Sequence, residues 1–373
     1  MRIIFAGGGT GGHLFPAIAI AQETLRLKPD AVVSFVGTEK GIEATEVQKQ
    51  GFPIHFISAV KLERGWSPKK LFENLKLPFR WKACLDECDR LIYQEEPDVV
   101  VGTGGFVSAP MVWAAYEWAI PTLIQEQNSV PGIATRILAW RADEVHLSFE
   151  SSRKFFKRDH VFVSGNPTRR FEKHDQQTAR KFFGIDAKRK TLFVFGGSLG
   201  ARSVNAALEV WLPELLQKFN VIWQTGKLDF TAVESRVGKK ENLWYGAFID
   251  RMDIAYAAAD LVVCRAGAST LAELATLGMA AVLVPYPFAA GNHQFFNAKT
   301  LAENGAAMLI ADAEIRSEQS KRKLIETLED EQKLNAMKTA CAKFAKPTAA
   351  TDIAKRVIAL AETHSWDDDE NEE

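Results

Sequence analysis

This chain has no large excess of charge of either sign, few cysteines and no long apolar run. Its 373 residues hold 46 Lys and Arg against 47 Asp and Glu, and a net charge of −1 argues against a general nucleic-acid binder. The four cysteines include the spaced pair Cys84 and Cys88 but no second pair, so the pattern excludes the common zinc and redox motifs. We therefore expect reduced thiols in a cytosolic protein.

No apolar signal segment is expected at the N-terminus, because Arg2 leads directly into Ile3-Ile4-Phe5 and a glycine cluster. No uninterrupted apolar run reaches the roughly 20 residues of a membrane span. We expect the chain to stay in the cytoplasm, where it can still touch a membrane surface.

Short branched-apolar runs alternate with helix-length amphipathic runs along the whole chain, which is typical of parallel sheets with crossover helices. Strands are expected near residues 2–6, 31–37, 54–60, 98–102, 121–125, 144–149 and 160–164, and in a second series near 191–196, 219–224, 243–249, 260–264, 280–284 and 306–310. Each series opens with a strand, a glycine cluster and a helix. The sequence predicts an α/β protein of two Rossmann-like domains whose ligand loops face a common cleft.

The two series meet at Ser164-Gly165-Asn166-Pro167, the expected hinge. This places an N-terminal domain at 1–165 and a C-terminal domain at 166–348. A final helix at 349–364 is expected to pack back on the N-terminal domain. The acidic tail at 365–373 has the composition of a disordered segment.

The stretch LVVCRAGASTLAELATLG at 261–278 reads as a strand followed by a helix that begins near Ser269 and Thr270. Unpaired N–H groups and the helix dipole favour an anion there, and a pyrophosphate suits the spot. Glu273, one turn inside, is a plausible acceptor for two vicinal hydroxyls such as those of a ribose. Gln294 and Asn297 follow the next strand, and their amide side chains can form hydrogen bonds with sugar hydroxyls. An ordinary βαβ unit with a capped helix would give the same pattern.

Gly7, Gly9 and Gly12 satisfy G-x-G-x-x-G after a strand, so a NAD-dependent oxidoreductase is a rival interpretation. The acidic residue expected after the second strand is then Glu39, which comes later than the usual spacing. His13 follows the last glycine directly, where an imidazole can accept a proton. A purely structural hydrogen bond of this histidine is the alternative.

Two further loops, GTGGFVSAP at 102–110 and IQEQNSVPG at 124–132, each follow an apolar strand and should lie beside the first glycine loop. Glu126 is a second candidate acid or base there, and the neighbouring amides Gln127 and Asn128 could orient a substrate. The alternative is that Glu126 has no catalytic role and simply forms an ion pair with a nearby cation.

The segment KLERGWSPKKLFENLKLPFRWK at 61–82 interleaves basic and apolar residues, as interfacial membrane helices do. Basic side chains near an anionic surface would each add about 1 kcal/mol of binding. An amphipathic helix packed on the core is the alternative, and Pro78 is expected to cut the helix in two. The residues predicted to contact the membrane are Trp66, Leu71, Phe72, Leu75, Phe79 and Trp81.

Seven stretches, spread in order over nearly the whole chain, together resemble the MurG family of peptidoglycan glycosyltransferases. They are GGGTGGHLFPAIAIA, GTGGFVSAP, PTLIQEQNSVPGIATRILA, VSGNPTR, FGGSLGARSVN, CRAGASTLAELATLG and VPYPFAAGNHQFFNA. The resemblance implies a two-domain GT-B fold, and transfer of GlcNAc from UDP-GlcNAc to lipid I (undecaprenyl-pyrophosphoryl-MurNAc-pentapeptide), which forms lipid II. It further implies a peripheral position on the cytoplasmic face of the cell membrane, with anionic lipids and other proteins of cell-wall synthesis as partners, and no nucleic acid.

The resemblance also assigns roles by position. Pyrophosphate and ribose would be held by Ser198 and the stretch Ala268, Ser269, Thr270, Leu271, Ala272 and Glu273. Uracil would meet the backbone near Ile249, and the GlcNAc hydroxyls would meet Gln294 with Asn297. Thr10, Gly11, Gly12, Asn128 and Arg169 would complete the site.

The family reaction inverts the anomeric centre, and no cofactor or metal is expected, because the helix N-terminus at 268–270 can stabilise the departing diphosphate. His13 is the predicted base and Glu126 the second candidate. Phe288 stands where many relatives have histidine. A nicotinamide oxidoreductase, a non-catalytic UDP-sugar receptor, and a transferase for another lipid acceptor stay open as alternatives.

Overall fold

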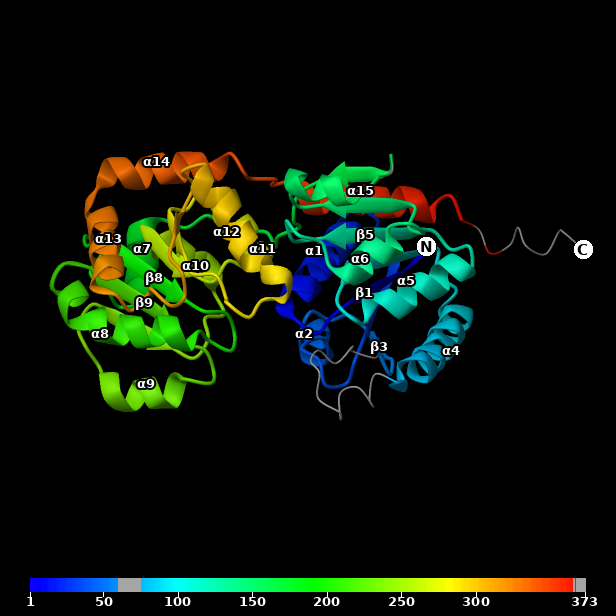
Figure 1. The fold of residues 1–373 in the computed structure, drawn as a ribbon, viewed down its shortest axis with the longest axis horizontal. Coiled ribbons are helices and arrows are strands. Elements are labelled where there is room, and N and C mark those ends of the chain that lie inside the picture. Colours follow the sequence, from blue (N-terminus) through cyan, green and yellow to red (C-terminus); the bar gives the residue numbers. More distant parts are fainter. Residues whose placement is uncertain (60–74, 158, 365, 367–373) are drawn as a thin grey trace, which may run out of the picture. The chain divides into compact units, whose positions relative to one another are not determined.

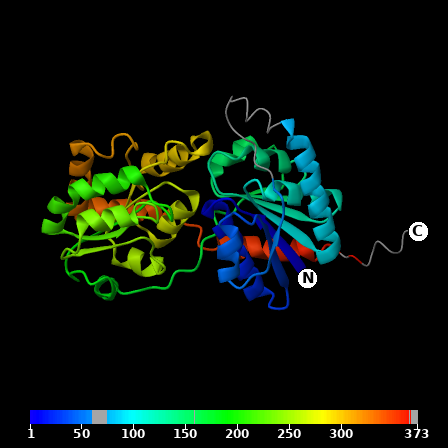
Figure 2. The same cartoon turned by 90° about the horizontal axis from the view of Figure 1, so that it is seen from below.

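The computed structural model describes residues 1–59, 75–157, 159–364 and 366. The chain divides into two compact units (Figures 1 and 2). The first unit comprises Met1–Arg169 and Lys346–Glu373, and the second comprises Arg170–Ala345.

The first unit is built on one parallel sheet of order β3-β2-β1-β4-β5-β6-β7. Its strands are β1 (Arg2–Gly7), β2 (Val32–Gly37), β3 (Ile54–Phe56), β4 (Val99–Gly104), β5 (Thr122–Glu126), β6 (Glu144–Leu147) and β7 (Val161–Val163). The helices described in it are α1 (Gly11–Leu27), α2 (Glu43–Lys49), α4 (Leu77–Glu95), α5 (Ser108–Glu117), α6 (Ile133–Leu138) and α15 (Ala349–Ala361), with a 3₁₀ turn at Glu150–Phe155. The strand order reverses between β1 and β4, which is where sheets of this kind bind ligands.

The second unit repeats the arrangement with the order β10-β9-β8-β11-β12-β13, again parallel. Its strands are β8 (Thr191–Phe195), β9 (Asn220–Gln224), β10 (Leu243–Gly246), β11 (Leu261–Cys264), β12 (Ala281–Leu283) and β13 (Met308–Leu309). The helices described in it are α7 (Gln176–Phe182), α8 (Arg202–Lys218), α9 (Phe230–Val237), α10 (Met252–Ala258), α11 (Ala268–Leu277), α12 (His293–Glu303), α13 (Glu318–Glu329) and α14 (Glu331–Ala342), with a 3₁₀ turn at Ala290–Asn292. The order reverses between β8 and β11.

Successive residues of the central strands face opposite sides of the sheet, and both sides are buried, as parallel sheets require. Ile3 and Phe5 pack with α1, α2 and α15, whereas Ile4 and Ala6 pack with α4, α5 and α6. The predicted α/β architecture of two parallel-sheet domains is confirmed, and every expected strand is present within a few residues of its expected position.

Pro78 follows a break in the helical segment, as expected: Leu75 is helical, Lys76 is a turn residue and α4 begins at Leu77. It stands in the first turn of α4, where its missing N–H has no partner to lose. The helix then runs on to Glu95. None of the described helices combines the length and the apolar character that crossing a membrane would need.

Helix α15 returns from the second unit and packs on α1 of the first, with Ile353 and Val357 buried against the sheet (Figure 1). A charged contact fixes it. The Arg356 guanidinium donates from Nε to the Glu144 carboxylate at 3.0 and 3.1 Å. On the other side of Glu144, Oε2 lies 2.9 Å from His146 Nε2, and His146 Nδ1 lies 2.6 Å from Ser164 Oγ. Burial opposes ionisation of Glu144, but the hydrogen bonds from His146 and Arg356 outweigh it and lower the pKa of this carboxyl to about 2.

We expect Arg356→Ala to lower the free energy of unfolding by roughly 1–3 kcal/mol at pH 7, because it removes the hydrogen bonds of a guanidinium to a buried carboxylate. A carboxyl with a depressed pKa contributes stability above its unfolded value, and this contribution is lost as the pH falls. The difference between wild type and variant in urea unfolding should therefore shrink as pH falls from 4.5 towards about 2. Lys355→Ala, at the neighbouring exposed position on α15, is the control and should cost little. A pH-independent difference would contradict this account.

Candidate functional site

Three loops of the first unit converge beside the start of α1. The β1–α1 and β4–α5 loops touch through their backbones: Gly105 has φ +83°, and a Cβ on it would lie 2.4 Å from the carbonyl oxygen of Gly8. Only glycine fits such an approach. The third loop, after β5, reaches the same place through Gln127. The predicted convergence of the three loops is thus confirmed.

His13 lies where the three loops meet. Its Nδ1 is 3.2 Å from the carbonyl oxygen of Thr103 and 3.0 Å from Gln127 Oε1. The Thr103 hydroxyl donates to the backbone carbonyl of His13 at 2.8 Å. A Cβ on Gly104 would come within 2.7 Å of His13 Nδ1, so the glycine leaves room for the ring. The imidazole is half-buried, and among the described residues its Nε2 has no hydrogen-bond partner.

Glu126, the second candidate base, is buried, and both of its carboxylate oxygens are engaged. Oε1 accepts from the backbone N–H of Asn128 at 3.0 Å and from its side-chain Nδ2 at 3.2 Å. Oε2 accepts from the N–H of Gly132 at 3.1 Å. This carboxylate therefore organises the loop before α6, and of the two candidates His13 is the one with a nitrogen left for proton transfer.

Sequence reasoning missed Glu43, a fully buried carboxylate at the start of α2. Its Oε2 accepts from the N–H of Gly9 at 2.9 Å, and its Oε1 accepts from the N–H and hydroxyl of Thr38 at 3.1 and 2.8 Å. A glycine-loop N–H that would meet the diphosphate of a dinucleotide is thus already paired within the protein. Glu39, the acid considered for NAD, is exposed instead. This arrangement argues against the NAD interpretation. The only signal in the sequence was an acidic residue in the first turn of a short helix.

The remaining predicted residues of the first unit lie in the loops that carry His13 and Gln127 or at the boundary of the unit. Thr10 is the N-cap of α1 and is exposed, as is Gly12, while Gly11 is half-buried. Asn128 is half-buried in the β5–α6 loop, and Arg169 is exposed as the last residue before the second unit begins.

In the second unit, α11 begins at Ala268 directly after the β11 loop, with Gly267 as its N-cap. The first turn of a helix leaves backbone N–H groups unpaired and carries the positive end of the dipole. Ser269 Oγ is a buried atom with no hydrogen-bond partner among the described residues. Leu271 offers no group of its own, because its side chain is buried and its N–H donates to the carbonyl of Gly267 at 3.0 Å. The helix start is suited to an anion.

Glu273 lies one turn further along α11, next to Ala272, and both are half-buried. The Tyr256 hydroxyl donates to Glu273 Oε2 at 2.8 Å. Tyr256 is itself buried in an aromatic cluster, with its ring edge-on to those of Phe171, Phe193 and Phe195 at 5.9, 5.6 and 6.0 Å. A fixed phenol thus sets the direction of this carboxylate.

The glycine loop after β8 is connected to the Ile249 backbone by one side chain. Gln224 donates from Nε2 to the carbonyl of Gly197 at 3.1 Å and accepts from the N–H of Ile249 at 2.9 Å. Because this N–H is engaged, the carbonyl is the backbone group of Ile249 left for a ligand. Ser198 is exposed in the same loop, and its carbonyl accepts from Lys227 N at 3.2 Å.

Gln294 and Asn297 both lie on α12 but in different environments. Gln294 is half-buried, and its Oε1 accepts from the N–H of Tyr286 at 2.9 Å, so its NH₂ group is the end that can donate to a ligand. Asn297 is fully buried, with Nδ2 3.5 Å from the carbonyl oxygen of Ala266 in the β11–α11 loop. The Asn297 side chain therefore contacts the β11–α11 loop from the buried side of that loop.

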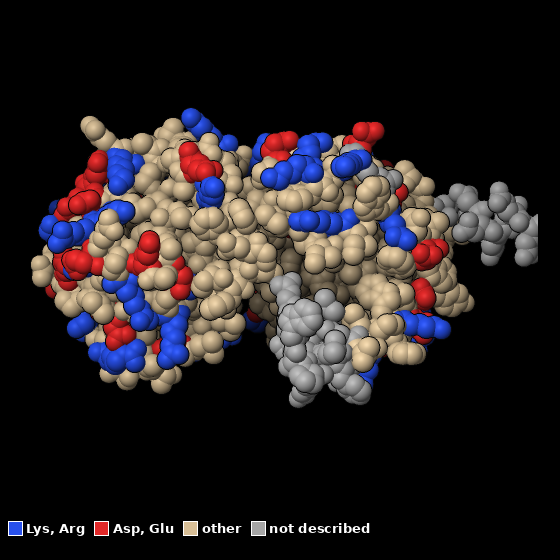
Figure 3. All heavy atoms as spheres, in the orientation of Figure 1, with Lys and Arg blue, Asp and Glu red and all other residues tan. Residues whose placement is uncertain are grey.

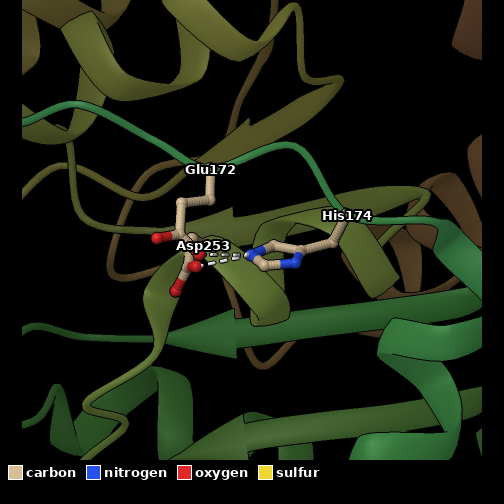
Figure 4. A group of neighbouring side chains, drawn as sticks. All are labelled: Glu172, His174 and Asp253. Atoms are coloured by element: carbon tan, nitrogen blue, oxygen red, sulfur yellow. Dashed lines mark hydrogen bonds and ion pairs between the residues drawn. The ribbon is translucent and has the colours of Figure 1, made fainter.

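Within the described part of the chain, one cluster has the composition of a metal site: Glu172, His174 and Asp253 (Figure 4). Arg251 already provides a cation there. Its Nη2 lies 2.7 Å from Asp253 Oδ2, 3.1 Å from Glu172 Oε2 and 3.4 Å from His174 Nε2. The hydrogen bond from Arg251 is the main cause that lowers the pKa of Asp253. The cluster is therefore an ion-pair network that holds the segment before α7 to the start of α10.

Of the predicted membrane residues, Trp66, Leu71 and Phe72 lie outside the described residues. Leu75, two residues before α4, and Phe79, in the first turn of α4, are 68% and 80% exposed. Trp81 is half-buried, edge-on to Trp113 of α5 at 6.4 Å. In Figure 3 the surface over α5 and α6 is mostly uncharged, with Lys and Arg side chains beside it.

Comparison with known proteins gives a consistent result over the whole chain. Residues 3–147 match the glycosyltransferase family 28 N-terminal domain, and residues 191–357 match the glycosyltransferase family 28 C-terminal domain. A protein of Prosthecochloris aestuarii is 51% identical over 97% of this chain and 99% of its own length. A protein of Salinibacter ruber is 40% identical over 97% of this chain and 98% of its own. Both are named UDP-N-acetylglucosamine–N-acetylmuramyl-(pentapeptide) pyrophosphoryl-undecaprenol N-acetylglucosamine transferase.

Among solved structures, the chain is similar to MurG of Acinetobacter baumannii, with 30% identity and a TM-score of 0.74 over 96% of this chain and 99% of that one. A putative UDP-N-acetylglucosamine 2-epimerase of Listeria monocytogenes has a TM-score of 0.64 at 11% identity, over 98% and 97% of the two chains. This second likeness shows the fold alone.

Proposed function

This chain belongs to the MurG family of glycosyltransferases, and we propose that it transfers GlcNAc from UDP-GlcNAc to the MurNAc 4-hydroxyl of lipid I, forming lipid II. The observation that carries this proposal is the full-length similarity to transferases of that name. Each unit contributes chemical groups that the reaction needs.

The second unit would bind the donor. The start of α11, with Ser269 and Thr270, suits the diphosphate, and the Ile249 carbonyl suits the uracil N3–H. Glu273 would accept from the ribose hydroxyls. The Gln294 amide would donate to the GlcNAc hydroxyls, while Asn297 supports the loop that holds the diphosphate.

The first unit would bind the acceptor and remove its proton. In an inverting transfer the MurNAc 4-oxygen forms a bond to C1 of GlcNAc while the bond from C1 to the UDP oxygen breaks on the opposite face. His13 Nε2 takes the hydroxyl proton, and the electron pair of the broken bond leaves with UDP. The positive end of α11 stabilises the charge that grows on the diphosphate.

The N-terminal end of α4 would place the protein on the cytoplasmic face of an anionic membrane. Leu75 and Phe79 are exposed apolar side chains, and Lys76, Arg80 and Lys82 are exposed beside them. Apolar insertion together with basic residues is the combination that holds a protein reversibly at such a surface.

The first test measures UDP release from UDP-GlcNAc with a lipid I analogue. We expect wild type to release UDP only when the acceptor is present, and His13→Ala to lose roughly 10²–10⁴-fold in kcat, the usual contribution of a general base. Binding of UDP-GlcNAc should stay unchanged. Glu126→Gln should lose much less. If a folded Glu126→Gln variant loses as much as His13→Ala, Glu126 is the base; if wild type never releases UDP, the proposed function is wrong.

The second test concerns the ribose. Tyr256→Phe keeps the aromatic packing but removes the hydrogen bond to Glu273, so UDP should bind about 3- to 10-fold more weakly, as expected for one hydrogen bond. Binding of 2′,3′-dideoxy-UDP should hardly change. Calorimetric titration of both nucleotides measures this, with Tyr245→Phe on β10 as the control. An equal loss for both nucleotides would point to general damage rather than to the carboxylate.

The third test measures sedimentation with vesicles that contain anionic lipid. Replacing Leu75 and Phe79 together by Ser should reduce binding roughly tenfold or more, because the partial burial of two apolar side chains is lost. Tyr93→Ser, at an exposed aromatic position near the other end of α4, is the matched control. Binding of UDP-GlcNAc should be the same in all three proteins. Equal vesicle binding by the double variant and wild type would remove α4 from the membrane proposal.

A further inference from the structure

The side chain that contacts the His13 ring belongs to a chain of buried amides. Gln127 is 2% exposed and Gln125 is fully buried. Gln127 Oε1 lies 3.0 Å from His13 Nδ1, and Gln127 Nε2 approaches the side-chain oxygen of Gln125. Gln125 Nε2 in turn donates to Ser148 Oγ at 3.1 Å and to Asn166 Oδ1 at 3.3 Å. These hydrogen bonds run from His13 into the interior of the first unit.

The surroundings of the Gln127 side chain determine which end of its amide faces His13. Gln127 Nε2 lies among three oxygens: the carbonyl of Thr103 at 2.6 Å, the carbonyl of Gln125 at 3.2 Å and the Gln125 side-chain oxygen. A carboxamide turned the other way would place its oxygen among these three acceptors without a hydrogen. The NH₂ group must therefore stay at this end, and the oxygen must face His13.

The fixed amide determines the tautomer of His13. Two oxygens face its Nδ1, those of Gln127 and of the Thr103 carbonyl, and neither carries a hydrogen. Nδ1 must then be the protonated nitrogen of the neutral ring, and Nε2 keeps the lone pair. A general base needs that lone pair on the nitrogen that meets the substrate.

We propose that Gln127 is a positioning residue of the transfer reaction: its buried, one-directional amide holds the His13 ring with Nδ1 protonated and presents Nε2 as the base for the acceptor hydroxyl. This inference rests on the proposed function for its catalytic consequence. The tautomer itself is a property of the protein without substrates. Gln127 therefore acts through His13 and touches neither sugar.

The first experiment observes the tautomer directly. Long-range ¹H–¹⁵N correlation of the imidazole rings, recorded on the full chain, distinguishes a protonated from an unprotonated ring nitrogen. The chain has seven histidines, and the signals absent from His13→Ala assign His13. We expect a protonated Nδ1 and an unprotonated Nε2 in the neutral ring of wild type. The reverse tautomer would overturn the proposal, whatever the variants do.

The second experiment uses Gln127→Met, which keeps the length of the side chain but removes both ends of the amide. With only the Thr103 carbonyl left to accept from Nδ1, part of the His13 population should change tautomer. We expect kcat to fall on the order of 10- to 100-fold, within the 10²–10⁴-fold contribution of a general base. KM for UDP-GlcNAc should stay within about twofold. Gln22→Met, on the exposed side of the same helix as His13, loses only a contact to Gln50 and is the control.

The outcomes separate this inference from the proposed function. If wild type does not transfer GlcNAc, the proposed function fails, while the ring spectra still test the tautomer. If wild type transfers GlcNAc and folded Gln127→Met keeps both the kcat and the His13 spectrum of wild type, only the role of Gln127 fails. A parallel loss of kcat and donor affinity would likewise contradict positioning, because a base acts after the donor has bound.

Discussion

The close approach of two glycine-rich backbones determines the surroundings of His13 in the first unit. Gly8 and Gly105 touch at the end of the sheet where the strand order reverses, and no side chain can stand between them. Through this contact the β4 loop supplies the Thr103 carbonyl to the His13 ring, and the β5 loop can reach the same ring through Gln127. A larger residue at position 105 would separate the loops and leave the histidine without its two acceptors.

The two units share a strand order, but the backbone N–H groups at the carboxyl ends of their strands have different partners. In the first unit the buried Glu43 carboxylate satisfies the N–H of Gly9 from inside the protein. In the second unit no described carboxylate bonds to the start of α11, and Ser269 Oγ is buried without a described partner. One fold therefore provides both a loop that is stabilised internally and a helix start suited to the diphosphate of a substrate. The first site follows β1 and the second follows β11, which lie on opposite sides of the point where the strand order of their sheets reverses.

The sequence predicted what depends on local pattern and missed what depends on tertiary contact. The strands could be placed because apolar β-branched runs between glycine clusters carry their own periodicity. The convergence of the three loops followed from the rule that carboxyl ends of parallel strands share an edge. By contrast, Glu43, Gln224 and Tyr256 act through partners far away in the sequence, and nothing in their neighbourhoods distinguishes them from ordinary residues. Burial of Asn297 and of Glu126 was likewise invisible, because both stand in polar stretches that read as exposed loops.

A neutral amide next to the proposed base has one chemical advantage over a carboxylate. Many catalytic histidines are oriented by a carboxylate, which also stabilises the imidazolium ion that forms on proton uptake. Here the oxygen that faces His13 belongs to Gln127, and the nearest carboxylate of the same loop, Glu126, is directed to the N–H groups of Asn128 and Gly132. The Gln127 amide thus orients the His13 ring and leaves Nε2 free. Unlike a carboxylate, it adds no negative charge that would favour the protonated ring. In the proposed acceptor site, which would also hold the negative diphosphate of lipid I, an additional carboxylate beside the ring would repel the substrate, and an amide avoids that cost.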